Sequence, residues 1–91
     1  MIYVFFADGF EEIEALAPVD FLRRAGVEVV TVGVASAEVT GAHGIKTGAD
    51  ITAEEVVLNE NLQGVILPGG MPGAENLNNN ELVQSAIDYC A

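Results

Sequence analysis

Apolar residues along this chain fall into short continuous runs and longer periodic stretches. Residues 2–6, 27–34 and 64–67 are rich in apolar and β-branched side chains, which is typical of strands covered on both faces of a parallel sheet. Residues 10–25 and 81–91 instead repeat apolar positions at the three- and four-residue spacing of helices. Strands that alternate with helices predict an α/β fold, in which right-handed crossovers join parallel strands.

The segment between the second and third runs has a different pattern. Glycines separate two short β-prone pieces, residues 39–40 and 45–47, and this predicts a small hairpin that leaves the main sheet. Thr52 is expected to cap a short helical segment that follows it. We therefore expect three parallel strands in the main sheet. The wholly apolar run at 64–67 should be central in a complete sheet, with an open hydrogen-bonding edge in these 91 residues.

The first helix begins after a turn at Asp8-Gly9 and carries three glutamates in its first turns. Acidic residues there complement the positive end of the helix dipole. A helical projection separates the three, because Glu14 falls at the edge of an apolar arc whereas Glu11 and Glu12 fall outside it. The apolar arc consists of Ile13, Leu16, Ala17 and Phe21. We therefore expect Glu14 to be the one carboxylate that faces the protein, and a candidate functional residue.

A second candidate lies at Gly69-Gly70, directly after the third strand. In a sheet of flavodoxin order the first and third strands are neighbours, so the loops at 8–14 and 68–73 should meet at their carboxyl ends. Paired glycines let backbone N–H groups approach developing negative charge, which predicts an oxyanion or small-anion cradle. The segment lacks both the dinucleotide-binding glycine pattern and the lysine of a P-loop.

Composition excludes several function classes. Fourteen acidic residues against three basic ones give a net charge of −11, which disfavours nucleic acids and anionic membrane surfaces as partners. No apolar run approaches the roughly 20 residues of a membrane span, and the N-terminus lacks the basic region of a signal peptide. With a single cysteine, the chain is expected to be a small cytoplasmic domain without a disulfide.

The lone histidine and the lone cysteine are given structural interpretations. His43 lies in the glycine-rich hairpin and is expected to be an exposed loop residue, and one histidine without a cysteine cluster argues against a metal site. Cys90 is expected to be buried and structural, because it lies on the apolar face of the last helix rather than on an elbow after a strand. That face comprises Leu82, Val83, Ala86, Ile87, Cys90 and Ala91.

Three segments together resemble the ThiJ/PfpI superfamily. They read G-F-E-E-I-E-A-L-A-P-V-D at 9–20, F-L-R-R-A-G at 21–26 and I-L-P-G-G-M-P-G-A at 66–74. The nearest branch is similar to the small deglycase- and chaperone-type proteins, which include the parkinsonism-associated one. The resemblance implies a flavodoxin-like parallel sheet with helices on both faces.

The resemblance also assigns roles to residues. The family's acid, which hydrogen-bonds a catalytic cysteine, matches Glu14, and its oxyanion-hole glycines match Gly69 and Gly70. That cysteine lies after the family's next strand, beyond Ala91. Residues 1–91 are therefore expected to be the N-terminal half of a single flavodoxin-like domain, incomplete and inactive alone, with its own C-terminal half as partner.

The resemblance implies a homodimer, which members of the family usually form, and the first helix offers independent support for a dimer contact. Asp20 and Arg24 project onto the same arc as Ile13, at a spacing that allows an ion pair. Two charges on an apolar arc are expected to be paired. Ile13, Asp20 and Arg24 are therefore our candidate dimer contacts.

The resemblance implies that the complete protein is a cysteine-dependent glyoxalase or deglycase, acting without a cofactor on 2-oxoaldehydes or their protein adducts. The alternative is an oxidative-stress sensor or chaperone without turnover, and peptidase-like or thiamine-pathway activities are less favoured. An FMN-binding flavodoxin is disfavoured because the first loop has no Ser/Thr-rich phosphate cradle.

Overall fold

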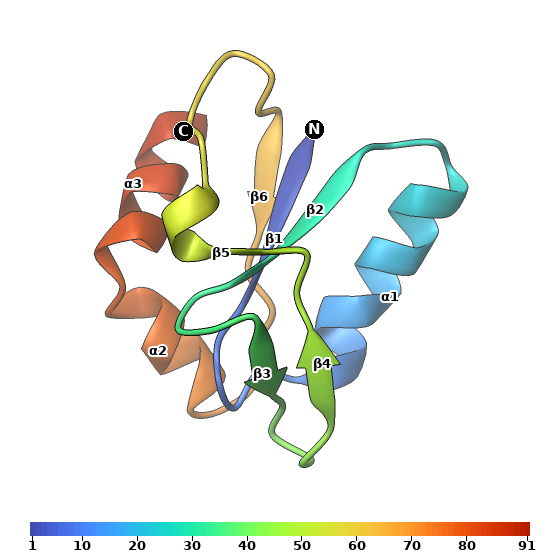
Figure 1. The fold of residues 1–91 in the computed structure, drawn as a ribbon, viewed down its shortest axis with the longest axis vertical. Helices are drawn as coiled ribbons and strands as arrows, with labels where there is room; N and C mark the ends of the chain where they lie inside the picture. Colours follow the sequence, from blue (N-terminus) through green and yellow to red (C-terminus); the bar gives the residue numbers. More distant parts are fainter.

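Four parallel strands form the sheet in the computed structural model, which describes residues 1–91. The spatial order is β5 (Ile51–Thr52), β2 (Val29–Gly33), β1 (Ile2–Phe6) and β6 (Gly64–Ile66). Figure 1 shows β1, β2 and β6 running the same way, so that their carboxyl ends lie together at the end of the sheet opposite the N-terminus. This arrangement confirms the α/β fold class and the expected adjacency of the first and third strands.

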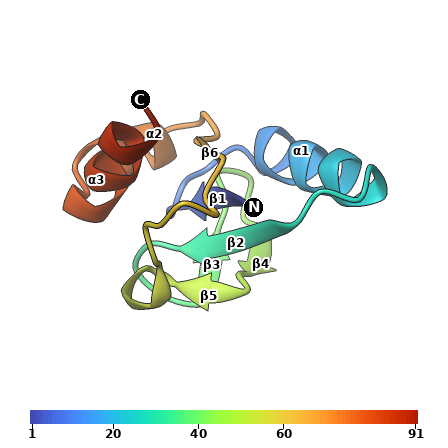
Figure 2. The same ribbon diagram turned by 90° about the horizontal axis from the view of Figure 1, so that it is seen from above.

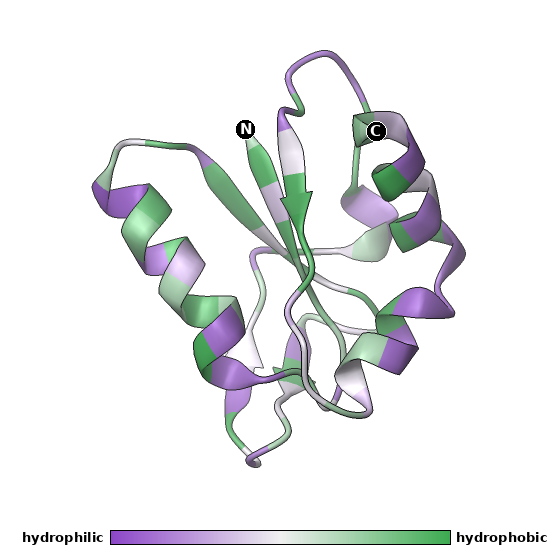
Figure 3. Cartoon of the chain, turned by 180° about the vertical axis from the view of Figure 1, so that it is seen from behind, coloured by the Kyte–Doolittle hydropathy of each residue, from purple (hydrophilic) through white to green (hydrophobic).

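Helices cover both faces of this sheet. Helix α1 (Glu12–Arg24) lies on one side of β1 and β6, and helices α2 (Gly73–Asn78) and α3 (Glu81–Cys90) lie on the other (Figure 2). The alternation of side chains along a strand explains this, because successive residues of β1 point to opposite faces. The two long central strands, β1 and β2, are largely hydrophobic (Figure 3).

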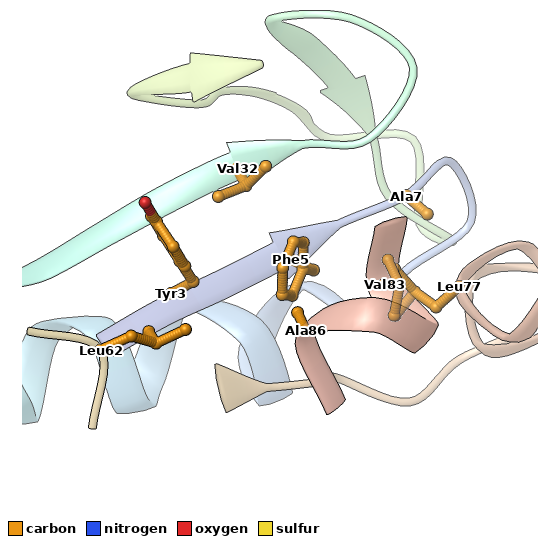
Figure 4. Close-up of a cluster of buried hydrophobic side chains, with 8 residues drawn as sticks. All are labelled: Tyr3, Phe5, Ala7, Val32, Leu62, Leu77, Val83 and Ala86. Carbon is orange, nitrogen blue, oxygen red and sulfur yellow. The ribbon is translucent and has the colours of Figure 1, made fainter. Parts of the chain in front are cut away.

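Each face has its own hydrophobic cluster. On the α3 face, Phe5 of β1 lies against Val83 and Ala86, and all three side chains are fully buried (Figure 4). On the α1 face, Val4 and Phe6 of β1 belong to a second cluster, whose other buried members are Phe10, Ala15, Val19, Val29 and Val39. The two aromatic rings of Phe6 and Phe10 are stacked with centroids 5.0 Å apart. Strand β1 is therefore the shared centre of both clusters.

The predicted hairpin is present and antiparallel, and consists of β3 (Glu38–Thr40) and β4 (Lys46–Gly48). It forms a separate two-stranded sheet at the carboxyl end of the main one (Figure 1). Buried Val39 anchors it in the cluster under α1. The short helix after Thr52 is a single 3-10 turn, Ala53–Glu55, and the residue before it is an N-cap as predicted.

Two expectations about the elements are wrong. The main sheet has four strands, because the sequence analysis missed β5, whose two residues carry too little pattern to detect. Strand β6 has intermediate burial and lies at the edge of the sheet in these 91 residues, which does confirm the predicted open edge. Cys90 is exposed rather than buried, since α3 packs through Val83 and Ala86, one turn or more before it.

The face of α1 that packs on the sheet is also not the predicted one. Its buried residues are Glu12, Ala15 and Val19, whereas Ile13 and Phe21 of the apolar arc are 74% and 67% exposed. Small Ala15 and Val19 let the helix approach the sheet closely, so the larger apolar side chains are left on the outer face. No helix of the structure is both long and apolar enough to cross a bilayer.

A polar cluster fastens β5 to β2. The carboxylate of Asp50 accepts hydrogen bonds from the Thr31 amide (3.0 Å) and from the Arg23 guanidinium (2.7 Å). The Asp50 amide in turn donates to the Thr31 hydroxyl (2.8 Å). Chiefly through the Thr31 amide, and with help from Arg23, these contacts lower the pKa of Asp50. The shortest strand of the sheet is thus held by a side-chain cluster in addition to its own ladder with β2.

We expect Asp50→Ala to destabilise the fold by about 1–2 kcal/mol, because it leaves the buried Thr31 amide without its acceptor. Urea unfolding with an unchanged m-value would measure this loss. The matched control is Asp20→Ala, which removes an exposed helical ion pair and should cost less than about 0.5 kcal/mol. Equal losses for the two variants would contradict the role given to Asp50.

Candidate functional site

Two loops meet at the carboxyl ends of β1 and β6, as the strand order predicts. The Glu11 amide donates to the Gly69 carbonyl (2.8 Å), and the Gly69 amide donates to Oε1 of Glu14 (3.0 Å). A third bond runs from the side-chain amide of Asn76 to the Asp8 carbonyl (2.8 Å). The structure therefore brings together Glu14 and Gly69, two residues that lie far apart in the chain and that were both predicted for the site.

This close approach depends on the absence of side chains in the second loop. A Cβ atom on Gly69 would lie 2.6 Å from Oε1 of Glu14. A Cβ atom on Gly70 would lie 2.5 Å from the Glu11 nitrogen, and Gly70 also has a positive φ of +95°. The docking of the loops therefore requires glycine at Gly70, where a Cβ would meet backbone atoms, whereas a Cβ at Gly69 would displace the Glu14 carboxylate from its present position.

The amides of Gly69 and Gly70 differ in whether they donate a hydrogen bond within the chain. The Gly69 amide is already bound to the Glu14 carboxylate. The Gly70 amide donates to no acceptor within the chain, although the Gly70 carbonyl accepts from Ala74 (2.8 Å). Of the two predicted oxyanion-hole donors, Gly70 is therefore the one whose N–H group is available in this structure.

Glu11 shapes the start of α1. It is the N-cap residue, and its carboxylate oxygens accept hydrogen bonds from the amides of Ile13 (3.2 Å) and Glu14 (3.0 Å). These bonds satisfy two of the amides that a helix leaves unpaired at its first turn. The cap fixes the backbone at Glu14 on one side, while the bond to Gly69 holds its side chain on the other.

Glu12, not Glu14, is the buried carboxylate of the three, and this corrects the expectation from the helical projection. Its side chain accepts from the amides of His43 (2.9 Å) and Ile45 (3.3 Å), and its Oε1 lies 2.9 Å from Nδ1 of His43. Only 3% of Glu12 is exposed, whereas Glu14 is exposed in these 91 residues. The hairpin turn supplies the polar partners that a buried charge needs.

The contact changes the proton affinity of both groups. Burial raises the pKa of Glu12, but the hydrogen bonds from the His43 ring and from the His43 and Ile45 amides outweigh it and lower that pKa from 4.5 to about 2. The hydrogen bond and the charge of Glu12 raise the pKa of His43 above its ordinary 6.5, despite partial burial, and Glu11 adds to the rise. His43 is an exposed turn residue as expected, yet its ring is engaged.

Glu11, Glu12 and His43 also offer oxygen and nitrogen atoms within 4.8 Å of one another, the spacing of a metal-binding set. The carboxylate oxygens of this set already accept hydrogen bonds. Both oxygens of Glu11 accept amides of α1, and those of Glu12 accept groups of the hairpin turn. We therefore assign no metal to this cluster.

The remaining predicted residues lie away from the loops. Asp20 and Arg24 form the expected i,i+4 ion pair, 3.2 Å apart, on the outer face of α1. Ile13 is exposed on the same helix. Cys90 ends α3. Sequence reasoning missed the Glu12–His43 contact, and the only signal for it was the return of a glycine-rich hairpin toward the end of the sheet.

The lone histidine makes this contact easy to test. We expect Glu12→Gln to lower the His43 pKa toward 6.5, because it removes the charge that favours the protonated ring. An NMR titration of the single imidazole in these 91 residues measures the change. In the control Glu11→Gln, whose oxygen lies 3.9 Å from Nδ1, the pKa should fall less. A fall of the same size in both variants would show that long-range charge, and not the contact, sets the value.

The contact has a defined pH window. The Glu12 pKa is lowered, so its contribution to stability is present above 4.5 and is lost as the pH falls through about 2. The His43 pKa is raised, so its contribution is complete below 6.5 and is lost as the pH rises through the raised value. The ion pair is therefore strongest from about pH 4.5 to 6.5.

Comparison with known proteins gives a consistent result. The model of the DJ-1/PfpI family matches residues 1–90. The Parkinson disease protein 7 homolog of Danio rerio is 35% identical over 85 residues, which are 92% of this chain and 45% of that protein. A deglycase of Thermococcus kodakarensis is 32% identical over 69 residues, 76% of this chain and 41% of the relative.

Solved structures agree with the fold. A cysteine-to-alanine mutant of a DJ-1 superfamily protein from Salmonella typhimurium has a TM-score of 0.90 and 37% identity, covering 98% of this chain and 48% of that one. Oxidised DJ-1 of Toxoplasma gondii has a TM-score of 0.87 and 37% identity, covering 93% and 46%. The chain thus spans somewhat less than half the length of these relatives.

Proposed function

Because this chain belongs to the DJ-1/PfpI family, we propose that its full-length protein is a cysteine-dependent enzyme of the glyoxalase or deglycase type. Its substrates would be small 2-oxoaldehydes or their adducts on proteins. The similarity to a deglycase supports this choice at the level of the family. The cysteine nucleophile would come from the C-terminal half of the protein, since Cys90 is the last residue of helix α3 and belongs to neither of the paired loops.

One observation carries the proposal: the Glu14 carboxylate is held by the Gly69 amide where the two loops meet. A carboxylic acid fixed there can exchange a proton with a thiol or with substrate oxygen. The neighbouring Gly70 amide has no other acceptor and can donate to an oxygen that gains negative charge. An acid and an oxyanion donor on adjacent segments are the two groups that addition to a carbonyl requires.

The first chemical step follows from these groups. The thiolate sulfur forms a bond to the aldehyde carbon, and the π electrons of the C=O bond move onto oxygen. The Gly70 N–H group stabilises this oxyanion. The proton that the Glu14 carboxylate has taken from the thiol then passes to this oxygen, which leaves a neutral hemithioacetal and regenerates the carboxylate. The hydrogen bond from Gly69 orients the carboxyl group throughout.

The C-terminal half is the partner that completes the sheet in this proposal. Strand β6 has an unpaired edge, and a groove of about 260 Å³ lies beside its end. The groove is lined by Leu67, Pro68, Gly69, Ala74, Leu77, Asn78, Val83, Gln84 and Ile87. An apolar strand edge of this kind needs cover from further chain. The relatives supply the required length, because each is more than twice the matched segment.

The test is turnover of methylglyoxal by the full-length protein and its Glu14→Gln variant. Glutamine keeps an oxygen for the Gly69 amide but cannot exchange the proton, so kcat/KM should fall by roughly 10²- to 10⁴-fold. In the control Glu54→Gln, which alters an exposed acid outside the loops, the rate should be unchanged. Full activity of Glu14→Gln, or no turnover by the wild type, would refute the proposal.

The alternative is an oxidation sensor that uses the same groups without turnover. The Toxoplasma relative solved in an oxidised state favours keeping this candidate. Glu14 would then hydrogen-bond an oxidised cysteine instead of a substrate. Detection of an oxidised cysteine by mass spectrometry after mild peroxide treatment, together with no turnover of methylglyoxal, would favour the sensor over the enzyme.

We further propose that α1 contributes to a homodimer. Ile13, Leu16 and Phe21 leave apolar surface on the outer face of the helix, where hydrophobic bands recur along its length (Figure 3). The exposed Asp20–Arg24 pair lies on the same arc of the helix as Ile13. Exposed apolar residues gathered on one helix face are typical of a subunit interface.

Sedimentation of Ile13→Arg in the full-length protein tests this surface. A charge placed against its symmetry copy should shift the protein from dimer to monomer. The control is Val57→Arg, since Val57 is another exposed apolar residue but lies outside α1. An unchanged dimer for Ile13→Arg would exclude this face.

A further inference from the structure

The β3–β4 hairpin is docked on the segment that carries the candidate site. The Gly9 amide donates to the Thr40 carbonyl (2.8 Å), and the Thr40 amide donates to the Asp8 carboxylate (3.1 Å). The Ala42 amide donates to the Phe10 carbonyl (2.7 Å). These three bonds join the hairpin to the β1–α1 loop residue by residue.

The contact continues into the first turn of α1 through Glu12. Its carboxylate accepts the amides of His43 and Ile45, and its Oε1 contacts the His43 ring. A Cβ atom on Gly41 would lie 2.2 Å from the Glu12 carboxyl carbon, so only glycine allows this approach. The turn is thus shaped around a side chain of the helix.

Glu12 and Glu14 belong to the same helical turn, which Glu11 caps. The hairpin therefore binds this turn through hydrogen bonds to Glu12, while the Gly69 amide binds the same turn through Glu14. We propose that His43 is a positioning residue, which acts through Glu12 to hold Glu14 against Gly69 and makes that contact respond to pH. An effect of His43 on activity rests on the role proposed for Glu14. The effect of His43 on the Glu14–Gly69 hydrogen bond does not depend on that role.

The direction of the response follows from the charges near the ring. Glu12 and, farther away, Glu11 face His43 from α1. The charged residues of the hairpin strands, Glu38 and Lys46, form no ion pair with it. The ion pair is complete when the ring is protonated and weakens as the pH rises through the elevated pKa of His43. The Glu14–Gly69 contact should weaken with it.

Hydrogen exchange of the Gly69 amide reports this contact directly. In the full-length protein, we expect its protection to fall by about tenfold as the pH rises past the His43 pKa, after correction for intrinsic exchange. In His43→Ala, protection should be low at every pH. In His43→Asn, which keeps a neutral donor but no charge, protection should match that of the wild type above the His43 pKa and should not change with pH. Ile45→Ala, an exposed neighbour that keeps its backbone amide, should resemble the wild type.

Protection in His43→Ala equal to that of the wild type would overturn the proposal. So would a wild-type profile without pH dependence, or a His43→Asn profile that still changes with pH. Methylglyoxal turnover measured on the same samples separates this result from the proposed function. If the wild type lacks turnover, the enzyme proposal fails while the exchange data still decide the role of His43.

Discussion

A buried carboxylate sets the arrangement at the carboxyl end of this sheet. Glu12 lies under α1 with 3% exposure, and a charge in that position is stable only if nearby donors replace water. The hairpin turn supplies three such donors from His43 and Ile45. The hairpin must therefore return to the start of α1, and Gly41 must be a glycine for it to come close enough. One charged side chain thus links the helix, the turn and the loop that carries the candidate site.

The same constraint fixes which way α1 faces. With Glu12, Ala15 and Val19 against the sheet, the larger apolar residues Ile13 and Phe21 are on the outside. A monomeric helix would normally bury such residues, because burial of a large apolar side chain contributes about 1.5–3 kcal/mol. Their exposure is consistent with a second surface that covers them. The inward charge and the outward apolar face are two consequences of one helix rotation.

Much of the fold could be predicted from the sequence, because the strands β1, β2 and β6 are apolar runs separated by clear turns. The hairpin was predicted from its glycines, and the meeting of the loops at 8–14 and 68–73 from strand order. The face that α1 turns toward the sheet could not be predicted. A helical projection favours the arc with the larger apolar residues, and it takes no account of close packing by small residues or of hydrogen-bond donors outside the helix. β5 was missed because its two residues carry too little pattern, and the Asp50 contact beside it is made with Thr31, nineteen positions away. Cys90 was wrongly predicted to be buried. The periodicity of apolar residues indicates which face of a helix packs, but not how far along the helix the packing extends.

The three glutamates of the first turn show how similar side chains are separated by their surroundings. Glu11 accepts amides of its own helix, Glu12 accepts groups of the hairpin, and Glu14 accepts an amide of the β6–α2 loop. Each carboxylate therefore joins α1 to a different partner. Of the three, only Glu14 combines solvent exposure with a fixed orientation beside an amide that has no acceptor, that of Gly70. A proton-transfer group needs access to its substrate as well as a defined position. Glu11 and Glu12 supply the position and Glu14 retains the access, so the chemistry assigned to one carboxylate depends on the structural roles of the other two.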